Sequence, residues 1–250
     1  MSQVKVAATN KVKAVILAAG RGSRLRELGP SKPLTHVDGI PLIERVIRTA
    51  AEGGADGIVV VTGYLGDDVR RFLDALSGRV DISIEYAANT EWHMGNGRSL
   101  LAAAPLLNAP FHVLMSDHLF DPEIMRDLRR TPLPAGSARL AVDSNLQNPY
   151  VDLDDVTKVL QQDGLIREIG KTIASYNVFD TGVFYCTPAL IAAIEASIVE
   201  HNDDSLSGGM RRLARAGKAE VMDIGARTWI DVDDPAAHGL ASRLFSLKAV

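Results

Sequence analysis

The chain has 250 residues, of which 46% are hydrophobic, and a formal net charge of −4. This length suffices for one large α/β domain with a substantial core. The small negative charge argues against a general nucleic-acid binder, so any anion site must be local. Membrane insertion is not expected, because no apolar run reaches the ~18 residues that a spanning helix needs.

The single cysteine, Cys186, excludes an internal disulfide framework and a multi-cysteine zinc site. The stretch from Met1 to Lys13 lacks the hydrophobic segment of a secretion signal. We therefore expect a cytoplasmic protein whose partners are small molecules, and a homodimer remains possible.

Apolar strand-like runs alternate with amphipathic helical stretches along the first half of the chain. The strand runs are nearly continuously apolar, which is typical of a mostly parallel sheet covered by helices. In chain order the sequence predicts strands over 13–18, 57–62, 81–86 and 111–115, and helices over 41–52, 67–77 and 99–107.

The second half is less regular. After a loop over 131–137, the pair Asp163-Gly164 predicts a hairpin within 157–168. Strands are predicted over 183–185 and 220–224, and helices over 188–200, 206–217 and 235–247. The simplest organisation is one domain over 1–250, with a nucleotide-binding part over about 12–130 and an acceptor-binding part over about 131–250.

A loop of small residues follows the first strand. It reads Leu17-Ala18-Ala19-Gly20-Arg21-Gly22-Ser23-Arg24-Leu25 and is followed by Ser31-Lys32-Pro33-Leu34. Little side-chain bulk lets a phosphate lie against backbone N–H groups, and Arg21, Arg24 and Lys32 can neutralise its charge. The glycine spacing matches neither a Walker loop nor the Rossmann fingerprint. The sequence therefore predicts a polyphosphate site of another type.

Acidic residues follow two of the apolar runs. Asp117 comes just after the run over 111–115, where ligands of open parallel sheets gather. Asp231 and Asp233 alternate with apolar residues and therefore share one face of an extended segment, whereas Asp234 before Pro235 is predicted to cap a helix. Two carboxylates from separate loops, together with phosphate oxygens, make a typical magnesium site. Taken alone, Asp117 is more simply explained as a helix cap or a solvated loop acid, and the second group of acids favours the metal site.

This combination of groups suits nucleotidyl transfer to a phosphate monoester. Such a monoester is largely ionised near neutral pH, since its second pKa is about 6, and it needs no strong general base. The enzyme must instead hold two anions in line and stabilise the leaving pyrophosphate.

The same motifs, in this order, resemble the signature of the sugar-1-phosphate nucleotidyltransferases over about Val12 to Leu247. The segment Gly95-Asn96-Gly97-Arg98-Ser99-Leu100 resembles their loop for base and ribose, and Ile169-Gly170-Lys171 with Asp180-Thr181-Gly182 resembles their acceptor segment. The most similar branch is the CTP:inositol-1-phosphate cytidylyltransferases. The resemblance implies a Rossmann-like, mostly parallel but mixed sheet of glycosyltransferase-A type. It also implies that CTP and inositol 1-phosphate give CDP-inositol and pyrophosphate.

The resemblance further implies a role for each matching residue. Arg24, Lys32 and Lys171 form the catalytic set: the first two neutralise the triphosphate and the third holds the acceptor's phosphate. The backbone of Leu17, Ala18, Ala19, Gly20, Gly22 and Ser23 cradles the triphosphate. Asn96 and Ser99 bond base or ribose, Gly95 and Gly97 permit close approach, and His118 and Thr181 face the acceptor. Mg²⁺ is bound by Asp117 and Asp231, with Asp233 as a substitute or second ligand.

Two alternatives remain open. The same chemistry could serve another sugar, cyclitol, choline or phosphonate acceptor with a different nucleoside triphosphate. The chain could also be a non-catalytic nucleotide-sensing module, although such a module has little physical reason to keep Lys32, Asp117 and Asp231 together.

Overall fold

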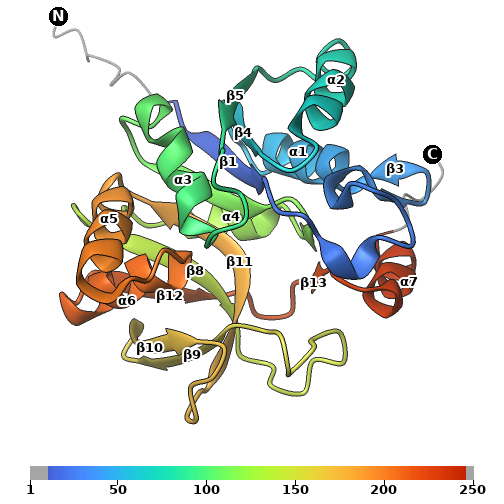
Figure 1. The fold of residues 1–250 in the computed structure, drawn as a ribbon. Coiled ribbons are helices and arrows are strands. Elements are labelled where there is room, and N and C mark those ends of the chain that lie inside the picture. The colour runs from blue at the N-terminus through green and yellow to red at the C-terminus, as the bar shows by residue number, and fades with distance from the viewer. Residues whose placement is uncertain (1–10, 246–250) are drawn as a thin grey trace, which may run out of the picture.

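A nine-stranded mixed β-sheet organises the molecule, which the computed structural model describes over residues 11–245 (Figure 1). Its strand order is β5-β4-β1-β6-β11-β8-β12-β10-β9. The strands of this sheet are β1 (Lys13–Ala18), β4 (Gly57–Thr62), β5 (Ile84–Ala88), β6 (Phe111–Met115), β8 (Ala138–Asp143), β9 (Lys158–Gln162), β10 (Leu165–Gly170), β11 (Val178–Cys186) and β12 (Ala219–Asp223). Two small ribbons pair β2 (His36–Val37) with β3 (Ile40–Pro41), and β7 (His118–Phe120) with β13 (Trp229–Asp231).

The helices connect these strands and cover the sheet. They are α1 (Leu42–Glu52), α2 (Gly66–Leu76), α3 (Gly97–Ala103), α4 (Glu123–Leu128), α5 (Ala189–His201), α6 (Leu206–Arg215) and α7 (Pro235–Leu244). Short 3₁₀ turns occur at Ser23–Leu25, Lys32–Leu34 and Ala104–Leu106. Within residues 11–245 no helix has the length and apolar character needed to cross a bilayer.

The first half of the sheet is parallel, as predicted. Strands β5, β4, β1 and β6 run in one direction, and every residue of β4 is buried. The strands predicted over 13–18, 57–62 and 111–115 are confirmed, whereas the one predicted over 81–86 spans Ile84–Ala88. The predicted helix over 99–107 begins at Gly97 and gives way to a 3₁₀ turn at Pro105, because proline lacks the N–H that a continuing α-helix requires.

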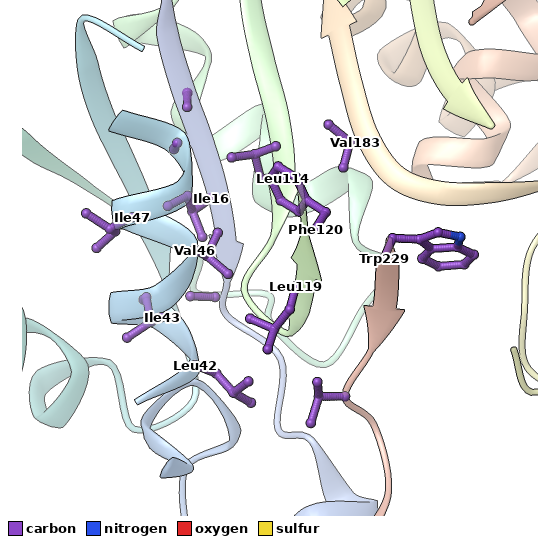
Figure 2. Packing of buried hydrophobic residues seen from close by; sticks show 14 of the residues in the cluster. Ile16, Leu42, Ile43, Val46, Ile47, Leu114, Leu119, Phe120, Val183 and Trp229 are labelled. Carbon is purple, nitrogen blue, oxygen red and sulfur yellow. The ribbon is translucent and has the colours of Figure 1, made fainter. Parts of the chain in front are cut away.

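Alternate residues of the central strands enter two separate cores. Ala14 and Ile16 of β1 pack with α1, α2 and α4 on one face, and Val15 and Leu17 pack with α3, α5 and α6 on the other. Figure 2 shows the first of these cores, where Val46 of α1 lies against Ile16. The period of two along a strand produces this division, and it leaves the carboxyl ends of the strands free to carry a site.

The second half is mixed. Strand β11 runs antiparallel to β6 and β8, β8 and β12 are parallel, and β9 with β10 forms the predicted hairpin. Strand β8 and helix α4 were not predicted. Strand β11 begins at Val178 instead of 183, so the segment Asp180-Thr181-Gly182, which was expected to precede the strand, lies inside it. The register shifts between Asp180 and Phe184, and Gly182 has a φ of 75°.

The last helix is capped as predicted, since the Asp234 side chain accepts a hydrogen bond from the Ala237 amide at 2.8 Å. Helix α7 ends at Leu244; the predicted end at 247 lies outside the described residues. The stretch from Met1 to Lys13, in which the sequence indicates no secretion signal, also lies largely outside the described residues, which start at Lys11.

Candidate active site

The ribbon of β7 and β13 brings together acids that are more than a hundred residues apart in the chain. Asp231 lies opposite His118 in the antiparallel register, and the Val232 amide donates to the Asp117 carbonyl at 2.9 Å. Asp117 therefore sits beside Asp231 at the end of β6, and Asp233 follows two residues later. The sequence analysis placed these carboxylates in separate loops, and the ribbon is the element that joins them.

Lys32 lies in the middle of these carboxylates. Its ammonium forms ion pairs with Asp117 and Asp233, and its Nζ is 4.0 Å from Asp231 Oδ1. Only 8% of the lysine is exposed. Burial lowers the pKa of the Lys32 ammonium, but the three carboxylates outweigh burial, and the net pKa is raised. The lysine therefore remains charged and compensates the repulsion among the acids.

The turn of small residues passes directly over Lys32. Leu17, Ala18 and Ala19 are buried, backbone included, whereas Gly20 is exposed and a Cβ at this position would meet no other atom. Gly22 has a φ of 60°, and a Cβ there would collide with the aliphatic stem of Lys32. Glycine is therefore required at 22 both by the left-handed backbone and by the lysine beneath it.

Asp155 is a member of the site that the sequence analysis missed. It lies in the loop over 144–157 and forms ion pairs with Arg24, at 2.6 Å, and with Lys171. Burial raises the pKa of the Asp155 carboxyl, but the two cations outweigh burial and hold it well below its usual range. Arg24 also pairs with Asp233. Arg24 and Lys171, two of the predicted phosphate-binding cations, thus converge on the carboxylate of Asp155.

His118 is held on all sides. Its Nδ1 donates to the Thr181 carbonyl at 2.8 Å, and its Nε2 lies 3.5 Å from Asp231 and 3.9 Å from Asp117. Burial lowers the pKa of His118, but the two carboxylates outweigh burial and raise the pKa to about 10. The imidazolium thus adds a positive charge beside the acids.

Two predicted contact residues have other partners than expected. The Thr181 side chain is fully buried and its hydroxyl donates to the Ala141 carbonyl at 2.8 Å, so the expected contact of this side chain with the acceptor is not available. The Ser99 hydroxyl is buried too and accepts from Asn89 Nδ2 at 3.0 Å. The hydroxyls of Thr181 and Ser99 therefore form hydrogen bonds inside the protein and are not available to a ligand.

The segment around Asn96 contacts the loop between α5 and α6. The Asn96 side-chain oxygen accepts from the Leu206 amide at 2.9 Å and so caps helix α6, which leaves its amide nitrogen for a ligand. A Cβ at Gly95 or Gly97 would collide with Asp204. These glycines thus permit close approach of protein backbone, where the sequence analysis expected approach of a nucleotide.

A cavity of about 350 Å³ opens beside these charged groups. Its lining combines charged side chains, such as Arg24, Lys171 and the acids, with apolar ones. The residues that line it include Asn96, Met115, His118, Tyr150, Val151, Asp155, Asp180, Phe184, Ser207, Trp229, Asp231, Asp233 and Leu240. Its size and mixed lining suit a small organic molecule that bears an anionic group.

The acids also fit a divalent cation. Donor atoms of Asp117, His118 and Asp231 lie within 4.8 Å of one another, as do those of Asp155, Asp231 and Asp233. The Asp231 Oδ1 atom is buried and makes no hydrogen bond. Carboxylate oxygens are the ligands that hard cations such as Mg²⁺ prefer, so this unsatisfied oxygen between two other acids fits a metal.

Comparison with known proteins identifies the family. Residues 14–217 match the model of the MobA-like NTP transferase domain. The chain is 38% identical over 229 residues to a bifunctional IPC transferase and DIPP synthase of Rubrobacter xylanophilus, which covers 90% of this chain and 50% of the relative. The chain spans about half the length of the curated relatives of this type that it matches.

Solved structures agree with the fold. The inositol-1-phosphate CTP transferase from T. maritima superposes with a TM-score of 0.78 at 25% identity, covering 96% of this chain and 99% of that one. A putative glucose-1-phosphate thymidylyltransferase from Bacillus anthracis superposes with a TM-score of 0.80 at 19% identity, over 96% and 97% of the two chains. With a nucleotidyltransferase fold and a matching domain over most of its length, this chain belongs to the MobA-like NTP transferase family.

Proposed function

We propose that this protein transfers the cytidylyl group of CTP to inositol 1-phosphate, giving CDP-inositol and pyrophosphate, with Mg²⁺. The observation that carries the proposal is the likeness to the T. maritima inositol-1-phosphate CTP transferase, which extends over nearly the whole of both chains. The name of the Rubrobacter relative, an IPC transferase, supports the same assignment.

The nucleotide side of the site is formed by the turn after β1. The backbone from Leu17 to Ser23 cradles the triphosphate, because its exposed part at Gly20 has open space above it. Arg24 and Lys32 then neutralise the phosphates. Both cations are already paired with acids, so the phosphates replace carboxylates as their partners. Asn96 contributes its free amide to the base or ribose.

Asp117 and Asp231 hold the Mg²⁺ ion, with Asp233 as the further ligand. When bound, the metal supplies positive charge that draws the phosphates of the two substrates together and stabilises the leaving pyrophosphate. The protein's part is to keep these oxygens converged, which the pairing of β7 with β13 achieves.

The acceptor side is the cavity beside Lys171. Lys171 and Arg24 converge on the Asp155 carboxylate, and an acceptor phosphate takes the same position between them. His118 and the Asp180 side chain, which line the cavity, face the ring. The nucleotide-binding part over about 12–130 and the acceptor-binding part over about 131–250 thus meet at this cavity.

The chemistry is an in-line displacement at phosphorus. An oxygen of the acceptor's ionised phosphate attacks the α-phosphorus of CTP, and the bond from the α-phosphorus to the bridging oxygen breaks to release pyrophosphate. No proton has to be removed from the nucleophile, since a phosphate monoester is ionised near pH 7. Positioning and charge compensation therefore suffice.

Partners and location follow from the same proposal. Both substrates are small molecules, and the net charge of −4 gives no reason to add nucleic acid. The single cysteine is fully buried, which suits a reducing cytoplasm.

A pyrophosphate-release assay tests the proposal. The purified protein is offered CTP, UTP, GTP, ATP or dTTP with a panel of phosphomonoesters and phosphonates, with Mg²⁺ or with EDTA. We expect the fastest turnover with CTP and inositol 1-phosphate and none in EDTA. Preference for glucose 1-phosphate, or for a phosphonate acceptor, would reject this assignment while leaving nucleotidyl transfer intact.

A further inference from the structure

We propose that Asp143 is a positioning residue for the acceptor half of the site. It acts through Trp229, which lines the cavity, and through Asn148, which directly precedes the lining residues Pro149, Tyr150 and Val151. This inference rests on the proposed function. Asp143 is the last residue of β8, is 3% exposed, and does not itself line the cavity.

The carboxylate of Asp143 joins three segments. Its Oδ2 accepts from the Trp229 indole Nε1 at 2.8 Å and from Asn148 Nδ2 at 2.7 Å, and its Oδ1 accepts from the Asn145 amide at 2.8 Å. The bond to Asn145 alone would be an ordinary Asx turn. The bond to Trp229 spans 86 residues of sequence and connects the turn to the strand that carries the metal-binding acids.

The first path runs through Trp229 to the metal side. Trp229 is the first residue of β13, two residues before Asp231, and its indole stacks on the His118 ring with centroids 6.2 Å apart and planes 30° apart. Figure 2 shows this indole extending away from the side of the core where α1 lies. Both rings line the cavity. Fixing the indole by its N–H therefore fixes one face of His118 and a wall of the cavity.

The second path runs through Asn148 to the acceptor loop. The Asn148 side-chain oxygen accepts from the Tyr150 amide at 3.0 Å, and its carbonyl accepts from the Val151 amide at 3.3 Å. Tyr150 and Val151 both line the cavity. The same loop carries Asp155, the partner of Arg24 and Lys171. One buried carboxylate thus links Trp229 to the loop that carries Tyr150, Val151 and Asp155, and so fixes lining residues from two segments relative to each other.

The variant Asp143→Asn keeps the shape of the side chain but removes its charge and one of its two acceptor oxygens. An amide can present only one acceptor oxygen, so either the Asn145 amide or the pair of Trp229 and Asn148 would face an N–H₂ group. The loss of a hydrogen bond to a charged partner corresponds to roughly 10–100-fold in an equilibrium constant. Trp229→Phe removes the N–H donor together with part of the ring volume, and keeps an aromatic ring at the position that stacks on His118.

The experiment compares Asp143→Asn, Trp229→Phe and the double variant with wild type, using the acceptor that wild type turns over fastest. Asp154→Asn is the matched control, because Asp154 is exposed on the same loop. Steady-state assays give KM for acceptor and for nucleotide separately, and thermal unfolding shows that each variant is folded.

We expect each single variant to raise the acceptor KM by ~10-fold or more and to leave the nucleotide KM within ~2-fold. The double variant should have an acceptor KM no higher than that of the worse single variant, because Trp229→Phe breaks the same Trp229–Asp143 bond that Asp143→Asn already weakens. The inference would be overturned if the two single-variant increases in acceptor KM multiplied in the double variant. An unchanged acceptor KM, or a loss of kcat alone, would also overturn it. If wild type turns over no acceptor at all, the proposed function fails first and this inference fails with it.

Discussion

Lys32 offers a direct test of how the acidic cluster is balanced. Its ammonium is 8% exposed and contacts Asp117, Asp231 and Asp233. Two unit charges 4 Å apart interact by about 4 kcal/mol at an effective dielectric constant of 20. Removing one partner of a buried pair costs about 3–5 kcal/mol. The lower end applies here, because the Asp231 side chain is 36% exposed and water screens it.

Lys32→Met keeps most of the aliphatic stem that Gly22 packs on and removes only the charge. Without divalent cations we expect the variant to lose about 3 kcal/mol of unfolding free energy. For a chain of this size that corresponds to a fall in Tm of roughly 6–12 °C. Turnover should fall by ~100-fold or more, since a major electrostatic contact to phosphate is gone.

Magnesium should partly replace the missing charge. A cation that binds only the folded protein stabilises it by about 1.4 kcal/mol at ten times its Kd. We therefore expect Mg²⁺ to raise the Tm of Lys32→Met more than that of wild type, where the ammonium competes for the same oxygens. The activity should not return, because the metal does not restore the phosphate contact.

The assay is thermal unfolding in EDTA and in a series of Mg²⁺ concentrations. Lys13→Met is the control, because Lys13 also pairs with an acid, Glu85 at 2.8 Å, but its side chain is 32% exposed and that of Glu85 is 45% exposed. An equal Mg²⁺ response in wild type and Lys32→Met would refute the reasoning. So would a loss of Tm no larger than that of the control.

Three further predictions use other parts of the molecule. Asp231→Asn should lower kcat by ~100-fold or more in the pyrophosphate assay; a rate near wild type would contradict its place at the metal. Lys171→Met should raise the acceptor KM by ~10-fold and spare the nucleotide KM, and the reverse pattern would exchange the two halves of the site. Burial, reinforced by Arg129, lowers the pKa of His112 to about 3. The folded state therefore binds fewer protons than the unfolded state below pH 6.5, and stability falls as the pH falls. His112→Asn should remove about 2 kcal/mol of the loss between pH 7.5 and 5, measured by denaturant unfolding; parallel profiles for variant and wild type would exclude this.

The parallel half of the sheet could be predicted because its signal is local. In β4 all six residues are buried, and a run such as Gly-Ile-Val-Val-Val-Thr has no amphipathic alternative. The missed strand β8 shows the opposite case. It carries Arg139 in a buried position, where the guanidinium pairs with Glu220 at 2.6 Å and donates to the carbonyls of Leu128 and Thr131. A charge in a short apolar run argues against a buried strand until those distant partners are known.

The candidate site divides in a similar way. The positions of Lys32, Asp117 and Asp231 could be inferred, because each follows a strand or turn whose end had been predicted. Asp155 could not be inferred, since its importance depends on Arg24, which lies 131 residues away in the sequence. Thr181 illustrates the limit of a motif. The motif correctly placed Thr181 near the site, but the pleat of β11 directs the Thr181 hydroxyl to the Ala141 carbonyl.

In the folded chain, the cations of the predicted catalytic set form ion pairs with the carboxylates of the site. Arg24, Lys32 and Lys171, the three cations of the predicted catalytic set, pair with Asp117, Asp155 and Asp233. Lys32 is only 8% exposed, so a phosphate can reach its ammonium only by displacing a carboxylate, and a displaced carboxylate left without a cation is costly. A divalent ion removes that cost by taking the freed oxygens. The geometry therefore makes binding of nucleotide and of metal mutually dependent: each should tighten the other by the same factor, and a nucleotide Kd unchanged by Mg²⁺ would mean that the acids stay paired with lysine and arginine throughout.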